Sequence, residues 1–525
     1  MNRLAADIKG RWAANRKLFL TCLISVFIWG MIGHAYGFFS GAFSHDSLNE
    51  FNAAVFGDEW KIQLGRVLVP AYHALVRSVL TLPWLVGITA LFYIGISVFI
   101  TAKIFRVRPV WAIILIAGIF TVNQTVTSTA ATYITDLDSN MLALLLSVIA
   151  VYLWQRYRYG FLIGIVPVGL SMGLYQGFVT MTITLVLIDL TLELLKGQDA
   201  KTVFVQGLKA VVMLIGGGIL YLILMKVICF ATGVEILSGN YNSVDTFLSM
   251  SIGDFIYYII WAYLTTCYNI LAPVSLYPFR AVVLVHVIMI GIGACIVIWK
   301  WISIKWKEKL LVILLIALMP LGMNIAYVLS GGVGHDVMYY AIWMDYLFVI
   351  LLAQLALGEK NSVPQKKISS GLKRGASVVS VCLVCAVLWS NVQTANAVYL
   401  KKDLEEDASL SLFTRIVYEM ESTEDYIPGE TPVVFVGNPS ELIEEVVGFD
   451  YIAALTGAGY TSVLGAAGRD YYQAYFDYIL LNPAIMADSE TWDEVSSSEA
   501  VEEMPSWPEA GSVQMINGVL VVKLS

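Results

Sequence analysis

Long apolar runs dominate the first three quarters of the chain and alternate with short polar loops. Most runs are roughly 17 to 23 residues long, close to the length that an α-helix needs to cross a bilayer, and the third and fifth are short. The pattern predicts an α-helical polytopic membrane protein with about eleven spans in residues 1–394. The predicted spans are 18–39, 83–102, 109–122, 139–155, 160–177, 178–195, 210–231, 281–299, 309–329, 338–357 and 375–394.

Two further apolar segments do not fit this alternation. Residues 62–82 contain Arg66 and His73, and residues 254–279 are rich in Tyr and Trp. Because a span at either place would disturb the alternation of charged loops, we predict two helices that lie on the outer membrane surface. Aromatic and basic side chains are favourable at that interface. Such helices could shape a groove for a lipid-linked substrate, or they could serve packing alone.

Residues 395–525 have a different pattern, which predicts a separate small α/β domain. Short apolar runs bounded by Gly, Pro and Asn are typical of strands. The clearest signal is a hairpin whose Asn517-Gly518 suits a type I′ turn. The predicted strands are 431–438, running into a turn, 478–481, 511–516 and 519–524, and the predicted helices are 403–421 and 441–456.

The charge of the loops predicts the orientation. The chain is 58% hydrophobic and 14% charged, whereas a soluble protein has about 25% charged residues. Loops on one predicted side carry about 22 Lys and Arg residues, and Lys/Arg-rich loops stay in the cytoplasm. The N-terminus is therefore expected in the cytoplasm and, with an odd number of spans, the C-terminal domain outside. The other side carries, before residue 395, only Lys61, Arg66, Arg77 and Arg280.

The tail is strongly acidic and argues against one class of partner. After residue 390 it holds about 23 acidic residues and about 5 basic ones. Such a surface repels phosphate backbones, so we expect no nucleic-acid partner. All six cysteines lie in apolar runs, including Cys382 and Cys385 in one predicted span. The sequence therefore predicts no disulfide framework and no cofactor, and it does not support a divalent metal.

The first outer loop carries the leading candidate for catalysis. Ser44-His45-Asp46-Ser47 follows the first predicted span. A carboxylate just outside a membrane span adds little stability, but a lipid-linked and a water-soluble substrate can both reach it. Asp46 could accept a proton from an acceptor hydroxyl as that hydroxyl attacks a sugar carbon. His45 could orient Asp46 or contact a phosphate. The alternative is an ordinary solvated loop acid.

The other candidate side chains are charged residues on the outer side. Asp136 and Asp138 lie on one side of the chain if it is extended. They could bind acceptor hydroxyls, share a metal, or cap the next helix. Arg66 could hold a lipid phosphate through two hydrogen bonds, or it could snorkel toward headgroups. Arg280 has the same two interpretations.

Two polar pairs complete the candidates. Tyr175-Gln176 lies at the outer end of a predicted span, where it could hydrogen-bond a sugar or anchor the span at the interface. His335-Asp336 follows the glycine-rich segment 331–334 in a late outer loop. This pair could contact the substrate at a gate, or the segment could be a turn between spans.

Several of these segments, in this order, resemble the GtrII-type glucosyltransferases of bacterial surface polysaccharides, which belong to the broader GT-C class. Each motif is short, so their order and topology give the resemblance its specificity. The resemblance runs over nearly the whole chain. The segments that carry it are Phe43–Leu48, Leu64–Pro70, Asp136–Asn140, Leu170–Gln176, Met504–Pro508, Gly511–Val513 and Asn517–Leu524.

The resemblance implies a glycosyltransferase that moves a sugar, glucose in this family, from a polyprenyl-phosphate carrier to a surface glycan outside the cytoplasmic membrane. It implies Asp46 as the general base of an inverting displacement. It also implies that Arg66 steadies the departing lipid phosphate, and His45 and Arg280 are the further candidates that the residues themselves suggest for contact with that phosphate. Many GT-C enzymes have paired acids in the first loop. This chain has His45-Asp46 instead, with one carboxylate, so a metal role lacks support.

Three other classes stay open on the sequence alone. A flippase or transporter of a lipid-linked glycan would favour internal repeats and charged or broken helices at mid-membrane, but the two halves show no repeat. A polysaccharide polymerase or ligase would favour basic residues in large outer loops, and these are few. A non-catalytic scaffold with a partner-binding tail is compatible with the acidic C-terminal domain.

Overall fold

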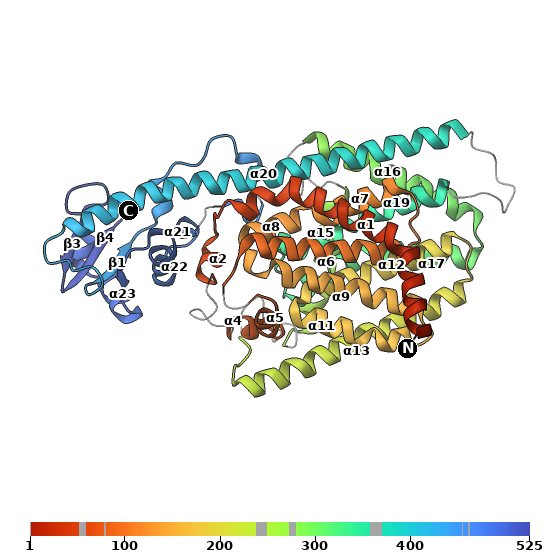
Figure 1. The fold of residues 1–525 in the computed structure, drawn as a ribbon, viewed down its shortest axis with the longest axis horizontal. Helices are drawn as coiled ribbons and strands as arrows, with labels where there is room; N and C mark the ends of the chain where they lie inside the picture. The colour runs from red at the N-terminus through yellow and green to blue at the C-terminus, as the bar shows by residue number, and fades with distance from the viewer. Residues whose placement is uncertain are drawn as a thin grey trace.

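The structure is a computed structural model that describes residues 2–51, 59–77, 80–237, 249–271, 280–357, 370–453, 455–459 and 462–525. Most of the chain forms one helical bundle, and a small sheet lies beyond one end of it (Figure 1). The longer helices are α1 (Asn2–Phe39), α6 (Pro83–Ile104), α7 (Val110–Thr121), α8 (Gln124–Thr132), α9 (Leu137–Arg156), α11 (Ile165–Leu174), α12 (Val179–Leu195), α13 (Ala200–Thr232), α15 (Ile252–Leu271), α16 (Arg280–Ser303), α17 (Trp306–Met323), α19 (Met344–Leu357) and α20 (Ser370–Ser422).

Short helices connect the long ones, mostly at the end of the bundle that faces the sheet. A Ser side chain or a Pro residue starts several of these short elements, which is typical of helix N-termini. They are α2 (His45–Asn49), α4 (Glu59–Gln63), α5 (Val69–Val76), η1 (Ile134–Asp136), α10 (Gly160–Ile163), η2 (Gln176–Phe178), α18 (Ile325–Leu329), η3 (Asp336–Met338) and η4 (Tyr340–Trp343).

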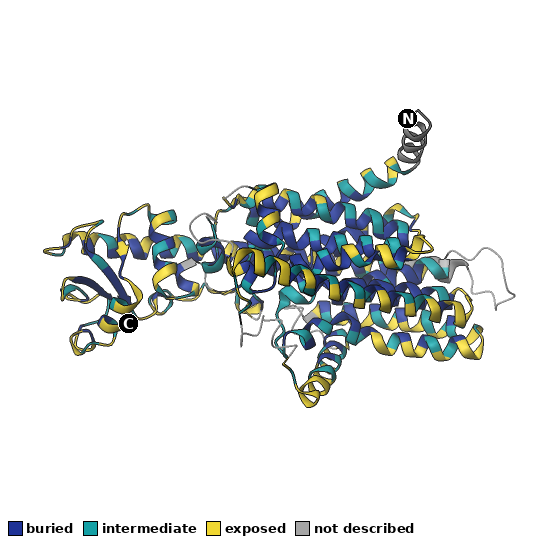
Figure 2. Cartoon of the chain, turned by 90° about the horizontal axis from the view of Figure 1, so that it is seen from below, coloured by how far each residue is buried: buried dark blue, intermediate teal, exposed yellow. Residues whose placement is uncertain are grey.

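The apolar helices match a membrane protein. Among the described residues, eight helices are long and apolar enough to cross a bilayer, and Gly160–Leu174 and Tyr340–Ala356 are shorter apolar helices. The helices at the periphery of the bundle keep exposed faces, while the central ones are buried (Figure 2). Helices α1 and α6 approach closely at a glycine, because a Cβ at Gly87 on α6 would clash with the Phe38 ring of α1. The count of eleven spans stays a prediction.

The C-terminal residues form a four-stranded sheet with the order β2-β1-β4-β3. Strand β1 pairs in parallel with both β2 and β4, and β3 and β4 are antiparallel. The predicted hairpin is confirmed, and Asn517 and Gly518 have φ angles of 52° and 83°, as a type I′ turn requires. The predicted strand that starts near residue 431 is also confirmed. The strands are β1 (Pro432–Val436), β2 (Ile485–Met486), β3 (Val513–Ile516) and β4 (Val519–Lys523).

Two predicted elements of this region are wrong. Residues 478–481 are not a strand, because the π-helix η7 (Phe476–Leu480) occupies this stretch and the buried Phe476 holds it in the core. The described residues between 441 and 456 form no α-helix. Two 3₁₀ turns, η5 (Pro439–Leu442) and η6 (Asp450–Ile452), cover parts of this stretch, and between them Gly448 has a φ of 92°, which breaks a helix.

Helix α20 links the bundle to the sheet. It is continuous over 53 residues and runs along the bundle before it reaches the sheet (Figure 1). Its far end contributes Leu412, Phe413 and Ile416 to the apolar core around β1. The predicted domain boundary at residues 394 and 395 falls inside this helix, and the division into two domains stays a prediction.

Candidate active site

The first loop is anchored to the bundle through α2. The Ser44 hydroxyl caps α2 by accepting from the Ser47 amide at 3.0 Å. The Ser44 and Ser47 hydroxyls both donate to the Thr132 carbonyl at the end of α8. The hydrogen bond from Ser47 is 2.7 Å long. The Ser47 hydroxyl also accepts from the Ile134 amide at 3.2 Å. These bonds fix α2 against the segment that leads into α9.

The C-terminal region holds the opposite side of α2. Leu48 is only 1% exposed and belongs to the apolar core that surrounds the sheet. The His45 ring lies edge-on to Tyr471, with a centroid separation of 5.4 Å, and Phe51 lies 5.1 Å from Tyr478. The first loop, with α2, therefore lies between the bundle and the C-terminal region and contacts both.

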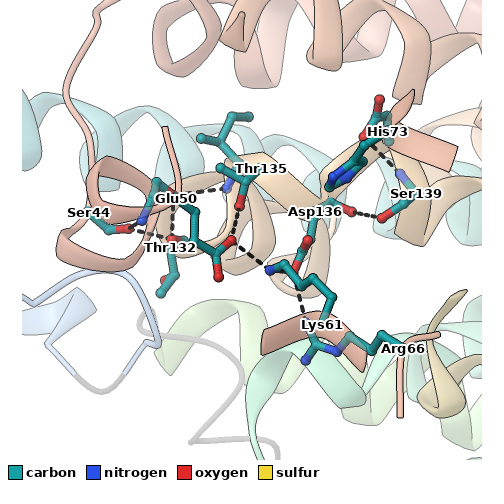
Figure 3. A network of polar contacts seen from close by, with 12 residues as sticks. Ser44, Glu50, Lys61, Arg66, His73, Thr132, Thr135, Asp136 and Ser139 are labelled. Atoms are coloured by element: carbon teal, nitrogen blue, oxygen red, sulfur yellow. Dashed lines mark hydrogen bonds and ion pairs between the residues drawn. The ribbon is translucent and has the colours of Figure 1, made fainter. Parts of the chain in front are cut away.

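Four charged residues form a buried ion network next to α2 (Figure 3). Lys61 Nζ lies 2.6 Å from Glu50 Oε2 and 2.9 Å from Asp136 Oδ2. Arg66 Nη1 lies 2.7 Å from the same Asp136 oxygen. The Thr135 hydroxyl donates to Glu50 at 2.9 Å. The residues come from α2, α4, the turn before α5 and η1, so the fold joins segments that are far apart in the sequence.

Burial decides the electrostatics of the network. Desolvation lowers the pKa of Lys61, but the carboxylates of Asp136 and Glu50 outweigh it, so the pKa lies above its ordinary value. For Arg66, burial likewise lowers the pKa and the Asp136 carboxylate raises it, and the resulting pKa also lies above its ordinary value. Both side chains are therefore cations. Their geometry is fixed, because separating either from its carboxylate would leave a buried charge uncompensated.

The network also includes one carboxylate oxygen that accepts no hydrogen bond from the described residues and an aromatic ring beside Arg66. Asp136 Oδ1 is buried and has no hydrogen-bond partner among the described residues. The Arg66 guanidinium lies over the Tyr175 ring, 4.9 Å from its centroid, which holds the flat face of the guanidinium. Gln176 Nε2 donates to the Leu64 carbonyl at 3.1 Å, close in sequence to Arg66. The structure thus brings together the predicted residues Arg66, Asp136 and Tyr175, with Gln176 alongside.

Asp138 lies beside this network with different partners. The Tyr72 hydroxyl donates to Asp138 Oδ2 at 2.9 Å, and Arg77 Nε lies 3.5 Å from the same oxygen. Arg77 also contacts His73 and the Thr135 carbonyl. The Asp138 side chain is fully buried, so its hydrogen bonds position α5 against the start of α9.

Asp46, the predicted base, is the accessible carboxylate of this region. Its side chain is 31% exposed, whereas that of Asp136 is 1% exposed. Its Oδ2 lies 3.4 Å from Nε2 of His45, which is the neighbour expected to orient it. In the described part of the chain, no Lys or Arg side chain forms an ion pair with Asp46. It lies one helical turn before Glu50, at the start of the same short helix.

Asp336 has partners outside the ion network. Asp336 Oδ2 accepts from the Thr456 amide at 2.9 Å, and the Asp336 carbonyl accepts from the Thr125 hydroxyl at 2.8 Å. Burial raises the pKa of this carboxyl despite the Thr456 hydrogen bond. His335 and Asp336 thus lie in a loop that joins α8 to the C-terminal region. The side chain of Arg280 lies outside the described residues.

Glu50 and Lys61, two members of the network, were not among the candidates predicted from the sequence. Glu50 lies four residues after Asp46, so a short helix in the first loop would have indicated a second carboxylate. Lys61 counted only as one of few cations on the outer side. Within the described ranges, no three His, Cys, Asp or Glu side chains lie close enough to hold a metal ion.

One comparison with known proteins identifies a family. The family model described as "Glucosyl transferase GtrII" matches residues 35–352, which include every residue of the ion network. No curated protein and no solved structure matches the chain.

Proposed function

Because the chain belongs to the GtrII glucosyltransferase family, it is a glycosyltransferase, and we propose how it works. It takes a sugar, glucose by the family description, from a polyprenyl-phosphate donor. It adds the sugar to a cell-surface polysaccharide on the outer side of a bacterial cytoplasmic membrane. The N-terminus then lies in the cytoplasm and the C-terminal region outside, following the distribution of basic loops.

The observation that carries this proposal is the pair of cations held by one carboxylate. Asp136 fixes Lys61 and Arg66 at the end of the bundle that faces the sheet. A lipid phosphate that leaves a sugar gains negative charge on its bridging oxygen. Preorganised cations stabilise such developing charge without reorganising during the reaction. Arg66 is also suited to two parallel hydrogen bonds with phosphate oxygens.

Asp46 suits the role of general base better than Asp136 does. A base must reach the acceptor hydroxyl and must have room for the proton. Asp46 is accessible and has no Lys or Arg ion pair in the described residues, whereas Asp136 is buried and bound to two cations. We therefore assign proton acceptance to Asp46 and the positioning of the cations to Asp136. His45, at 3.4 Å, orients the base.

The reaction is one inverting displacement. The acceptor oxygen attacks the anomeric carbon as its proton moves to Asp46, and the bond between that carbon and the phosphate oxygen breaks. The electron pair of that bond stays on the lipid phosphate, beside Arg66 and Lys61. The sugar passes through an oxocarbenium-like transition state. We further propose that the sugar and the acceptor are bound by the polar residues Asp138, Tyr175, Gln176, His335 and Asp336.

The test is sugar transfer by the purified full chain from synthetic polyprenyl-phosphate-glucose to the host's own surface glycan. The proposal predicts a product whose linkage has the opposite anomeric configuration to the donor. Retention of the donor configuration would contradict the single displacement. Movement of the donor across a vesicle bilayer without transfer would instead support the flippase alternative.

A further inference from the structure

A second cationic region lies at the opposite end of the bundle from the ion network. Helix α9 connects the two regions: Asp136 immediately precedes its first residue, and Arg156 is its last. Twenty helical residues span about 30 Å, so the two regions cannot form one site. Two cavities, of 480 Å³ and 710 Å³, lie at the Arg156 end. Arg106, Glu193 and Gln198 line both, and we call the pair the distal cavities.

The distal cavities are positively charged. The basic side chains along their walls are Lys103, Arg106, Arg108, Arg156 and Lys196, and the acidic ones are Asp189 and Glu193. Both acids already have partners. Gln155 Nε2 donates to Asp189 Oδ1 at 2.7 Å, and Lys196 Nζ lies 2.8 Å from Glu193 Oε1. Arg106, Arg108 and Arg156 form no ion pair within the described residues, so their charge is available to an anion.

The loop that carries two of these arginines is held in a fixed conformation. Arg106 has a φ of 53°, in the left-handed region that a non-glycine residue rarely adopts. Side-chain amides from two other helices hold the loop: Gln354 Nε2 donates to the Arg106 carbonyl at 3.4 Å, and Gln155 Nε2 donates to the Ile104 carbonyl at 3.2 Å. Such conformations persist where the surroundings impose them and cluster at ligand sites.

The larger cavity is amphipathic. Besides its cations it is lined by the apolar side chains Phe105, which follows α6, Trp111 on α7, and Leu351 and Leu355 on α19. A free inorganic anion gains nothing from such a wall. A lipid can place its headgroup among the arginines and its first methylene groups against Trp111 and Leu355. Basic pockets between membrane helices bind anionic headgroups in this way.

We propose that the distal cavities bind the phosphate of a membrane lipid whose headgroup carries a net negative charge. Arginine pairs with phosphate through two parallel hydrogen bonds, and three arginines that form no ion pair within the described residues line the distal cavities. The site is separate from the transfer reaction at the other end of α9. The inference therefore holds or fails independently of the proposed donor and acceptor.

The experiment is lipid binding by the purified full chain in detergent, followed by native mass spectrometry. The probes are phosphatidic acid, phosphatidylcholine and inorganic phosphate. Wild type should retain phosphatidic acid about tenfold more strongly than phosphatidylcholine, since the phosphomonoester of phosphatidic acid has no cation of its own, whereas the choline group of phosphatidylcholine compensates its phosphodiester charge. Inorganic phosphate should bind weakly, because it lacks the apolar contact. Inorganic phosphate that binds as tightly as phosphatidic acid would overturn the assignment to a lipid.

The variants separate this site from general attraction of anions. R106Q/R108Q/R156Q should lose about tenfold in phosphatidic acid binding. The matched control is Arg158→Gln, whose guanidinium lies over Tyr159, 5.3 Å from the ring centroid, outside both cavities. Arg108→Gln alone should show a smaller loss in the same direction if the triple variant does not fold. Undiminished binding by a folded triple variant, or an equal loss in Arg158→Gln, would overturn the proposal.

Discussion

The two ends of α9 use basic side chains in opposite ways. At its start, Lys61 and Arg66 are buried and held by the shared carboxylate of Asp136. At its end, Arg156 is exposed beside a cavity and forms no ion pair with a described residue. Paired buried cations have a fixed geometry, which suits charge stabilisation in a transition state. Unpaired cations at a cavity keep their charge for a ligand that comes and goes.

Stability gives the largest expected contrast between the two ends. Lys61→Met should lower the free energy of unfolding by about 3–5 kcal/mol, because Glu50 and Asp136 would keep buried charges without this partner. Arg156→Met, at the exposed end, should change it by less than about 0.5 kcal/mol. Denaturant unfolding of the two solubilised variants beside wild type measures both values. Equal losses would show that the burial of the network does not matter.

Catalysis gives the second contrast. Arg66→Lys keeps the charge but removes the planar fork and the stacking on Tyr175. We expect kcat/KM for the polyprenyl-phosphate donor to fall by about 10-fold to 100-fold, which corresponds to one or two lost charged hydrogen bonds. Arg158→Lys is the matched change at the other end, because the Arg158 guanidinium also lies over a tyrosine ring, and it should leave kcat/KM within about twofold. A similar fall in both variants would contradict the assignment of Arg66 to the leaving phosphate.

Local patterns in the sequence predicted the elements that local physics decides. Apolar runs located the long helices, and Asn517-Gly518 located the hairpin, because a type I′ turn depends on those two residues. The failures involve tertiary context. Residues 478–481 have a strand-like composition, but burial of Phe476 favours a helical turn there. Gly448 interrupts the helix predicted over 441–456.

The candidate site shows the same limit. Arg66 and Asp136 stood out in the sequence because charges are rare on the outer side. Their pairing joins positions 70 residues apart, which no periodicity records. Glu50 and Lys61 were missed because their importance comes from burial, and burial at the contact between α2, α4 and η1 depends on the whole fold.

The smallest expected effect concerns the link between the Asp336 loop and the C-terminal region. Burial raises the pKa of Asp336 above its ordinary value of 3.8, so the folded chain holds this proton more tightly than the unfolded chain does. The contribution to stability is present below pH 3.8 and is lost as pH rises through the folded pKa. The loss is about 1.4 kcal/mol for every tenfold difference in proton affinity between the folded and unfolded chains. The free energy of unfolding of Asp336→Asn should not show this decline as pH rises. Unfolding curves of both proteins from pH 3 upward give the comparison, and parallel curves would contradict it.

The central claim is the division of work between two carboxylates: Asp46 takes the proton and Asp136 holds the cations. Its most direct test is steady-state transfer from synthetic polyprenyl-phosphate-glucose by Asp46→Asn and Asp136→Asn, at equal amounts of folded protein. The exposed Asp450→Asn serves as the control. We predict that Asp46→Asn lowers kcat by about 10²-fold to 10⁴-fold with little change in donor KM. Asp136→Asn should lower kcat less, by about 10-fold to 100-fold, because Lys61 and Arg66 lose the carboxylate that orients them toward the developing charge. Full kcat in Asp46→Asn, with transfer abolished in Asp136→Asn, would contradict the account.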